Sequence, residues 1–223
     1  MSKLLMIRRL TIAVAAFAIV SIGSLYLYER LLSVRAEFML RTAYELSEQR
    51  QAPTLADIRE RYGNRLKPRD GCTASDCGYT VVLSNRVLAA LHAVPYTELE
   101  SYFWVRAGRV TETLLDYTAR ANDGHTFVSH VQIDFCEDCQ SFSINPWGDS
   151  SPLDKNGTVQ IGNQAPANEK RTALSLNTSC LTKAGCYNIA DLLPTVWKRT
   201  ADNKIACRIQ NHEGWVRKPV GWP

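Results

Sequence analysis

The distribution of apolar and charged positions sets the N-terminal part of the chain apart. Residues 10–28 contain no charged side chain, and Tyr26 and Tyr28 stand at the end of this run. A helix over these nineteen residues would be about 28 Å long, close to the hydrocarbon thickness of a bilayer. Tyrosine rings favour the lipid–water boundary. The pattern therefore predicts a transmembrane signal-anchor over residues 10–28, with the lipid bilayer as its partner.

The flanking charges orient this segment. Residues 1–9 carry Lys3, Arg8 and Arg9 and no acid, and basic residues before a span keep that end in the cytoplasm. We expect a cytosolic stub over residues 1–9 and an extracytoplasmic chain, periplasmic or extracellular, after the span. A cleavable signal peptide is the alternative, because Ser21-Ile22-Gly23 has small residues at the spacing of a cleavage site. The apolar run continues past that site, which favours the anchor.

Beyond the span the apolar positions first follow a helical period. Residues 29–50 contain neither Gly nor Pro, and their apolar side chains recur every three or four positions. This predicts a juxtamembrane helix that continues out of the span. The extracytoplasmic domain is then residues 51–223. Its first element is expected to be a short helix over residues 55–62, with Thr54 as its N-cap and Gly63 as its stop.

From residue 79 onward the pattern changes to strands. Residues 79–84 are rich in β-forming side chains, and residues 98–106 and 109–119 predict a hairpin that turns at Ala107-Gly108. Residues 125–135 alternate most regularly between apolar and polar side chains. The sum predicts an α+β fold, in which the membrane-rooted helix packs against a mainly antiparallel sheet with short helices.

The other segments give weaker patterns. Residues 87–92 fit either a strand or a single helical turn. Gly, Pro and Ser make residues 145–171 loop-like, and residues 172–176 are then expected to return to the sheet. A short helix over residues 188–197 and a last strand over residues 204–209 complete the expected domain.

This plan is similar to that of type IV pilins, which join an N-terminal membrane helix to an antiparallel sheet. Pilins also carry a Gly cleavage site followed by an apolar residue, and a Glu five residues into the mature helix. Residues 1–14 contain neither the Gly nor an acid. The resemblance is therefore one of architecture, and the chain is not assigned to that family.

The seven cysteines all follow the apolar run, and in an exported domain they predict disulfides. Six of them form three local pairs, and these are Cys72 with Cys77, Cys136 with Cys139, and Cys180 with Cys186. Cys207 is left over, although it could also displace either member of the pair Cys180 and Cys186.

Cys136 and Cys139 would allow two other chemistries. In a thiol–disulfide oxidoreductase the first cysteine of C-x-x-C lies at a helix N-terminus, which stabilises the thiolate. Here the motif follows a strand pattern, and the two carboxylates between the thiols would raise the pKa of both. A zinc site with Cys180 and Cys186 would need thiolates, which an oxidising compartment removes. A structural disulfide is the favoured interpretation, and no metal or cofactor is expected.

The net charge and the absence of known catalytic motifs disfavour several classes of function. Three of the 26 Lys and Arg lie in residues 1–9, which leaves 23 bases against 22 acids and no global field for nucleic acid. Gly-rich phosphate loops, hydrolase elbows and H-E-x-x-H are absent, and His130 is expected to be a surface residue rather than a catalytic base. The sequence predicts a non-enzymatic binding or scaffolding module of the cell envelope with a protein partner. The alternative is an oxidoreductase that uses Cys136 and Cys139.

The charge pattern around the apolar run generates a prediction about topology. Protein in membrane fractions should resist extraction by alkaline carbonate, because residues 10–28 are held by hydrocarbon. Protease added from outside the cytoplasm should digest the domain. A soluble mature product that begins near Ser24 would contradict the anchor and favour the signal peptide.

Overall fold

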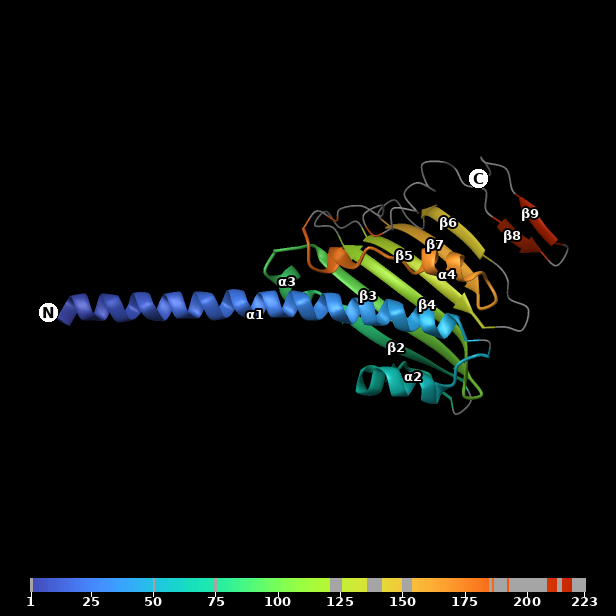
Figure 1. Cartoon of the computed structure of the whole chain (residues 1–223), viewed down its shortest axis with the longest axis horizontal. Coiled ribbons are helices and arrows are strands. Elements are labelled where there is room, and N and C mark those ends of the chain that lie inside the picture. The colour runs from blue at the N-terminus through green and yellow to red at the C-terminus, as the bar shows by residue number, and fades with distance from the viewer. Residues whose placement is uncertain are drawn as a thin grey trace.

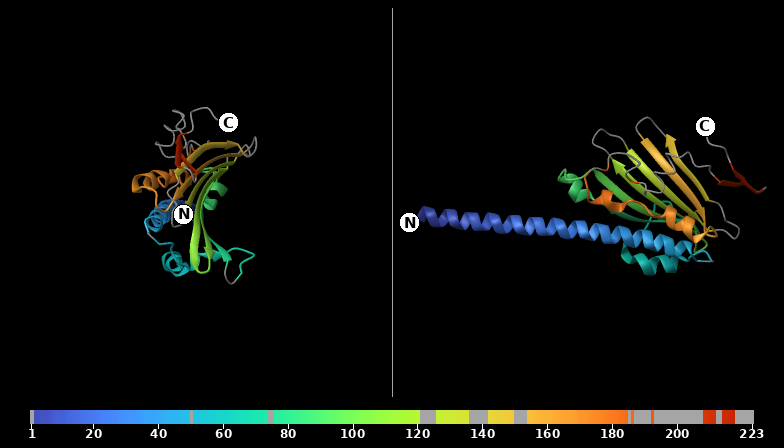
Figure 2. Two further views of the ribbon diagram at one scale, coloured as in Figure 1. Left: turned by 90° about the vertical axis from the view of Figure 1, so that its right-hand side faces the viewer. Right: turned by 45° about the horizontal axis from the view of Figure 1, so that its top comes forward.

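A computed structural model of the chain shows one long helix along a face of a twisted sheet (Figure 1). Its N-terminal half extends far beyond the sheet, and shorter helices flank its C-terminal half (Figure 2). The structure describes residues 2–49, 51–73, 76–120, 126–135, 142–149, 154–184, 186, 192, 208–211 and 214–217.

Helices and strands alternate little along the chain, as in an α+β fold. The helices are α1 (Ser2–Ser47), α2 (Leu55–Tyr62), α3 (Arg86–Ala90) and α4 (Ala167–Ala173), with 3-10 turns η1 (Gly63–Arg65) and η2 (Thr178–Leu181). The strands are β1 (Lys67–Pro68), β2 (Asp76–Ser84), β3 (Tyr96–Arg106), β4 (Arg109–Arg120), β5 (Thr126–Asp134), β6 (Phe142–Asp149), β7 (Asp154–Gly162), β8 (Arg208–Asn211) and β9 (Gly214–Arg217).

The main sheet has seven strands in the order β1-β2-β3-β4-β5-β7-β6. Every neighbouring pair is antiparallel except β5 with β7, which is parallel. Strands β8 and β9 form a separate antiparallel pair. A long apolar helix and a mostly antiparallel sheet with short helices confirm the α+β part of the predicted fold class.

Helix α1 has two halves with opposite surroundings. Between Ile7 and Ile22 its large apolar side chains are 60–74% exposed, and this helix is long and apolar enough to cross a bilayer. In its C-terminal half a seam at spacings of three and four residues is at most 3% exposed. This seam is Leu32, Ala36, Met39, Ala43 and Leu46. The seam belongs to the same hydrophobic core as the covered face of the sheet, so α1 is itself a core element.

Aromatic rings join α1 to both neighbouring layers. The ring of Phe38 on α1 meets Tyr62 of α2 edge-on at 5.7 Å, and Tyr62 lies 5.5 Å from Phe103 of β3. Arg61 of α2 also pairs with Glu45 on α1. Contacts of this kind fix the rotation of a helix as well as its position, because each ring accepts a neighbour only in certain orientations.

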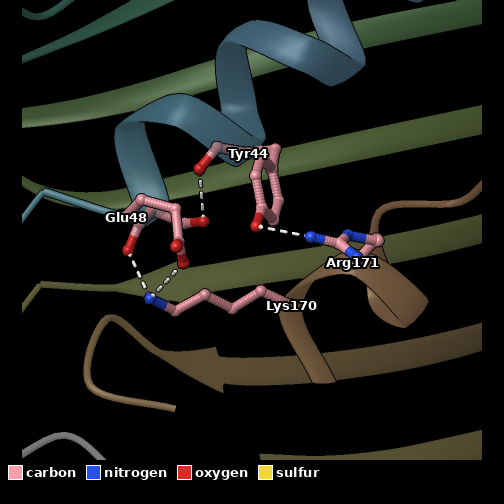
Figure 3. Close-up of polar contacts among 5 residues, drawn as sticks. Tyr44, Glu48, Lys170 and Arg171 are labelled. Atoms are coloured by element: carbon pink, nitrogen blue, oxygen red, sulfur yellow. Dashed lines mark hydrogen bonds and ion pairs between the residues drawn. The ribbon is translucent and has the colours of Figure 1, made fainter. Parts of the chain in front are cut away.

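The last turn of α1 is held by a lysine from α4 (Figure 3). The Lys170 side chain is only 6% exposed, and its ammonium donates to the Ser47 carbonyl oxygen at 2.7 Å and to Glu48 Oε1 at 3.0 Å. Arg171 lies over the Tyr44 ring at 5.8 Å. A helix C-terminus carries partial negative charge and unpaired carbonyl groups. Lys170 therefore satisfies this end of α1 and ties it to the domain.

Local sequence signals place several elements correctly. Helix α2 begins with a reciprocal capping box between Thr54 and Asp57 and ends at Gly63, which has a φ of +55°. The β3–β4 turn has positive φ at both Ala107 (48°) and Gly108 (78°), as a two-residue hairpin turn of type I′ requires. Residues 87–92, which fitted a strand or a helical turn, are mostly helical in α3.

The loop expected over residues 145–171 is wrong. Most of it is regular, in β6, β7 and the start of α4. Pro146 suggested a loop, but β6 is the edge strand and its pairing with β7 shifts register between Asn145 and Gly148. An edge position with a bulge tolerates proline. The sequence signal for β7 was weak, because only Val159 and Ile161, which are both fully buried, show the alternation of apolar residues expected of a strand.

Residues 172–176 do not return to the sheet, so this expectation is also wrong. Helix α4 continues to Ala173, and Leu174 and Leu176 are buried after it. The apolar residues of this segment therefore serve a helix end packed on the core. Of the helix expected over residues 188–197 the structure describes Leu192 alone, and of the strand over residues 204–209 it describes residues 208 and 209, in β8.

The α1–α4 contact generates a prediction about stability. Lys170→Met should lower the free energy of unfolding by about 2 kcal/mol, because a buried helix carbonyl and Glu48 lose a charged donor. Arg171→Ala is the matched control and should cost less than about 1 kcal/mol, since it removes one exposed contact over a ring. Denaturant unfolding of both variants in the same detergent measures the difference. Equal losses would contradict a special role for Lys170.

Candidate functional site

The face of the sheet turned away from α1, here called the open face, carries the polar chemistry of the domain. Along β3 every second side chain is buried against the core, beginning with Thr97 and Leu99. The alternate side chains are half-exposed and combine aromatic and acidic groups. On β3 these open-face residues are Tyr96, Glu98, Glu100, Tyr102 and Trp104.

Cross-strand register extends this surface over β4 and β5. Glu100 pairs with Asp116, and Asp116 pairs with His130. Glu112 pairs with Asp134 in the same way. The described part of the open face on β3, β4 and β5 thus holds five carboxylates, and these are Glu98, Glu100, Glu112, Asp116 and Asp134.

One aromatic–carboxylate group on this face holds an arginine of the chain itself. The Arg69 guanidinium lies 5.0 Å from the Tyr102 ring centroid and 3.5 Å from Glu100 Oε1. The Thr80 hydroxyl donates to the same Glu100 oxygen. A cation over a ring and beside a carboxylate gains from both, so this arrangement recognises a guanidinium.

Gly78 makes room for that group. A Cβ at Gly78 would lie 2.5 Å from the Tyr102 hydroxyl oxygen and 2.8 Å from its Cε2. The ring therefore rests directly on the β2 backbone. Burial raises the pKa of the Tyr102 phenol, while the neighbouring Arg69 acts in the opposite direction.

A second group of the same composition lies at the other end of β3. Arg120 lies 5.8 Å from the Tyr96 ring centroid, and the Tyr96 hydroxyl donates to Glu98. Tyr96 and the nearby Glu98 also raise the pKa of Arg86, with the hydrogen bond to Tyr96 the larger cause. The open face thus places a second arginine of the chain over a tyrosine ring, whose hydroxyl is bonded to a glutamate.

A third group has the same parts, and among the described residues no cation is paired with it. Glu112 and Asp134, here called the acidic pair, face each other across β4 and β5, and Trp104 pairs with Glu112 from β3. Asp134 accepts hydrogen bonds from Gln132 Nε2 at 2.9 Å and Gln160 Nε2 at 2.8 Å. Within the described chain, no ion pair joins Glu112 or Asp134 to an Arg, Lys or His.

The acidic pair is electrostatically strained. Burial is the larger cause that raises the pKa of Glu112, and the negative charge of Asp134 raises it further. A like charge disfavours ionisation, and a bound cation would reverse that effect. The Trp104 ring lies 5.9 Å from the Tyr102 ring, so the third group adjoins the first.

His130 lies on the open face, as the alternation predicted, but it has a partner that the sequence did not reveal. Its Nδ1 is 2.6 Å from Asp116 Oδ1. Catalysis by such a pair would also need a nucleophile in reach. In the parts of the chain that are described, neither residue bonds to a Ser, Thr or Cys side chain. The geometry is that of a cross-strand polar pair.

The four described cysteines form disulfides, and Cys72 lies beside Arg69 of the first group. Disulfides join Cys72 to Cys77 and Cys180 to Cys186, and each closes a local loop. Cys180 and Cys186 are therefore not thiolates, which contradicts the zinc alternative that used them. The described residues hold no group of three or more His, Cys, Asp or Glu that could bind a metal ion. Cys136, Cys139 and Cys207 lie outside the described residues.

Sequence reasoning missed the open-face groups, although one signal for them was present. In residues 96–104 the side chains at every second position, starting with Tyr96, are only tyrosine, tryptophan and glutamate. To identify their neighbours on β4 and β5, one must know the register in which the strands pair, and the sequence does not give that register. No protein-family model, curated protein or solved structure matches this chain.

The raised pKa of Glu112 generates a pH-dependent prediction. The folded state binds this proton more tightly than the unfolded state, whose carboxyl keeps its ordinary value of 4.5. Glu112 therefore destabilises the fold when ionised, and the penalty disappears as the pH falls through the raised pKa. Glu112→Gln should increase the free energy of unfolding at pH 7 and leave it nearly unchanged at pH 4.

Denaturant unfolding at both pH values measures the effect. Glu37→Gln, which removes an exposed carboxylate on α1, is the control of equal charge and should change neither value appreciably. A Glu112→Gln variant that is less stable than the wild type at pH 7 would contradict the assignment.

Proposed function

We propose that this chain is a membrane-anchored, non-enzymatic binding module of the cell envelope. Residues 10–28 cross the bilayer, the N-terminus is cytoplasmic, and the domain lies outside the cytoplasm. Its open face binds a basic segment of a partner protein through Trp104 and the acidic pair. The observation that carries the proposal is the third aromatic–carboxylate group, to which the described residues supply no paired cation.

The anchor is supported by the two halves of α1. Between Leu10 and Ile22 the helix is uncharged and its large apolar side chains are each 60–74% exposed, which is stable in hydrocarbon and not in water. Lys3, Arg8 and Arg9 precede it and favour a cytoplasmic N-terminus. The disulfides Cys72–Cys77 and Cys180–Cys186 fit an oxidising compartment on the other side.

The choice of a basic partner follows from the chemistry that the face already uses. Tyr102 with Glu100 binds Arg69, and Tyr96 is contacted by Arg120. Trp104 with the acidic pair repeats these parts, and tryptophan is the best ring for a cation. A lysine or arginine supplied by a partner would lie between two carboxylates that now repel each other. Anionic partners are disfavoured by the five carboxylates of the face.

Three of the four described helices leave this face uncovered (Figure 2). Helices α1, α2 and α4 lie on the opposite side of the sheet (Figure 2). Because α1 is docked on that side, the open face keeps a fixed orientation relative to the anchor helix. Such a module would position a partner near the bilayer surface by binding alone.

The proposal predicts binding of a cationic peptide. The full chain in phosphatidylcholine nanodiscs should bind a labelled peptide of alternating Arg and Gly, and affinity should fall as salt rises. Trp104→Ala and Glu112→Gln should each weaken binding about tenfold, because a desolvated ion pair and a cation–ring contact are each worth roughly 1–2 kcal/mol. Fluorescence anisotropy measures the affinity.

Glu37→Gln controls for the loss of one negative charge and should bind like the wild type. A peptide of alternating Glu and Gly controls for non-specific adhesion and should not bind. Equal affinities of the Glu112→Gln and Glu37→Gln variants would contradict the proposed site, and so would binding that is insensitive to salt.

A further inference from the structure

One end of the domain exposes apolar side chains on α3 and the turn that follows it. Val87 is 48% exposed and Leu91 is 57% exposed, whereas Leu88 between them is 1% exposed and holds α3 on the core. Ala90 and Ala93 are exposed beside them. Two large apolar side chains on one short helix and its turn, fixed in place from behind by Leu88, present a small apolar patch.

A hydrogen bond fixes the height of this patch along α1. The Tyr28 hydroxyl donates to the Ser84 carbonyl oxygen at 3.2 Å, and Ser84 lies two residues before α3 begins. Tyr28 is the last residue of the uncharged run. In Figures 1 and 2, α3 lies at the end of the domain that faces the N-terminal half of α1. The patch and the end of the run are therefore at the same level.

This level corresponds to the edge of a bilayer, if α1 crosses one as proposed above. The polar layer on each side of the hydrocarbon is about 5–8 Å thick. Leu31 lies three residues beyond Tyr28, which is about 4.5 Å along a helix. It therefore remains within that layer, and it is 43% exposed. Leu31 on α1 and the apolar patch on α3 both lie just beyond the edge of the hydrocarbon. Both therefore fit the polar headgroup layer of the same bilayer.

The charges at this end fit the same environment. Arg30 on α1, Arg86 at the start of α3 and Arg120 at the end of β4 are all exposed. Two acids also lie at this end: Glu29, which is half-exposed beside Arg30, and Glu98, which is already bonded to Tyr96. Arginines at the level of lipid phosphates bind them through charge and hydrogen bonds. A water-facing end would gain nothing from Val87 and Leu91.

We propose that residues 86–93 lie in the headgroup layer of the bilayer that anchors α1, with Val87 and Leu91 in contact with lipid. The domain then touches the membrane at two places, α1 and α3, on opposite sides of the sheet end. Two contacts restrict the tilt of the domain, which one helix alone does not. The bilayer therefore sets the direction in which the open face points. This inference rests on the membrane anchor of the proposed function and is independent of the partner.

Photo-crosslinking to lipid tests the inference. The photoreactive residue p-benzoylphenylalanine replaces Leu91, Phe17 or Arg106 in the full chain, which is then reconstituted in phosphatidylcholine vesicles and irradiated. Position 17 lies in the span, and position 106 lies ten residues along β3 from Tyr96, at the far end of the sheet. Mass spectrometry should find an adduct of one phospholipid at positions 17 and 91 and none at position 106. Val87 provides a second position if the Leu91 variant does not fold.

The outcomes separate the inference from its premise. An adduct at position 17 with none at positions 91 and 87 would overturn the inference and leave the anchor intact. No adduct at position 17 would contradict the anchor and the inference together, because the height of α3 is derived from the span. A crosslink from position 91 to a second protein chain in place of lipid would show that protein covers the patch, and would also overturn the inference.

Discussion

The packing of the second half of α1 on the sheet is the contact on which the rest of the structure depends. Its seam alternates large and small side chains, and burial of Leu32, Met39 and Leu46 stabilises the fold by about 2 kcal/mol each. Ala36 and Ala43 between them let the helix lie close to the sheet. Small residues also lie on the covered face of the sheet, where Ser101, Thr113 and Ser129 are fully buried.

This packing makes the exposed half of α1 and the folded domain one continuous element. No linker separates them, because a single helix runs from Ser2 to Ser47. Its far end is closed by Lys170, and its midpoint is held by the Tyr28–Ser84 hydrogen bond. The orientation of the domain is therefore set by the orientation of the helix. In the proposed membrane setting, the helix that anchors the chain also orients the open face.

Covering one face of the sheet leaves the other available for recognition. The open face repeats one chemical unit, an aromatic ring beside a carboxylate, and two copies contact arginines of the chain. The copy at Trp104 and the acidic pair has the same parts, and burial together with the charge of Asp134 raises the pKa of Glu112. A site that is costly to keep charged and is built like its occupied neighbours is suited to a cationic ligand.

Local signals in the sequence predicted the elements whose causes are local. The capping box at Thr54, the turn at Ala107-Gly108 and the uninterrupted helical period of α1 all lie within a few residues of what they determine. Strand β7 escaped prediction because it pairs in parallel with β5, more than twenty residues earlier, and only two of its apolar residues mark the alternation. The site escaped for the same reason, since Trp104, Glu112 and Asp134 meet only through the register of three strands.

Hydrogen–deuterium exchange along α1 tests the central claim most directly. If residues 32–46 are a core element, their amides in the full chain in nanodiscs should exchange as slowly as those of β3 and β4, because exchange then requires opening of the domain. Residues 47–49, at the end of the helix, should exchange faster. Rapid exchange of residues 32–46 beside a protected sheet would show that α1 is only loosely attached, and would contradict the account.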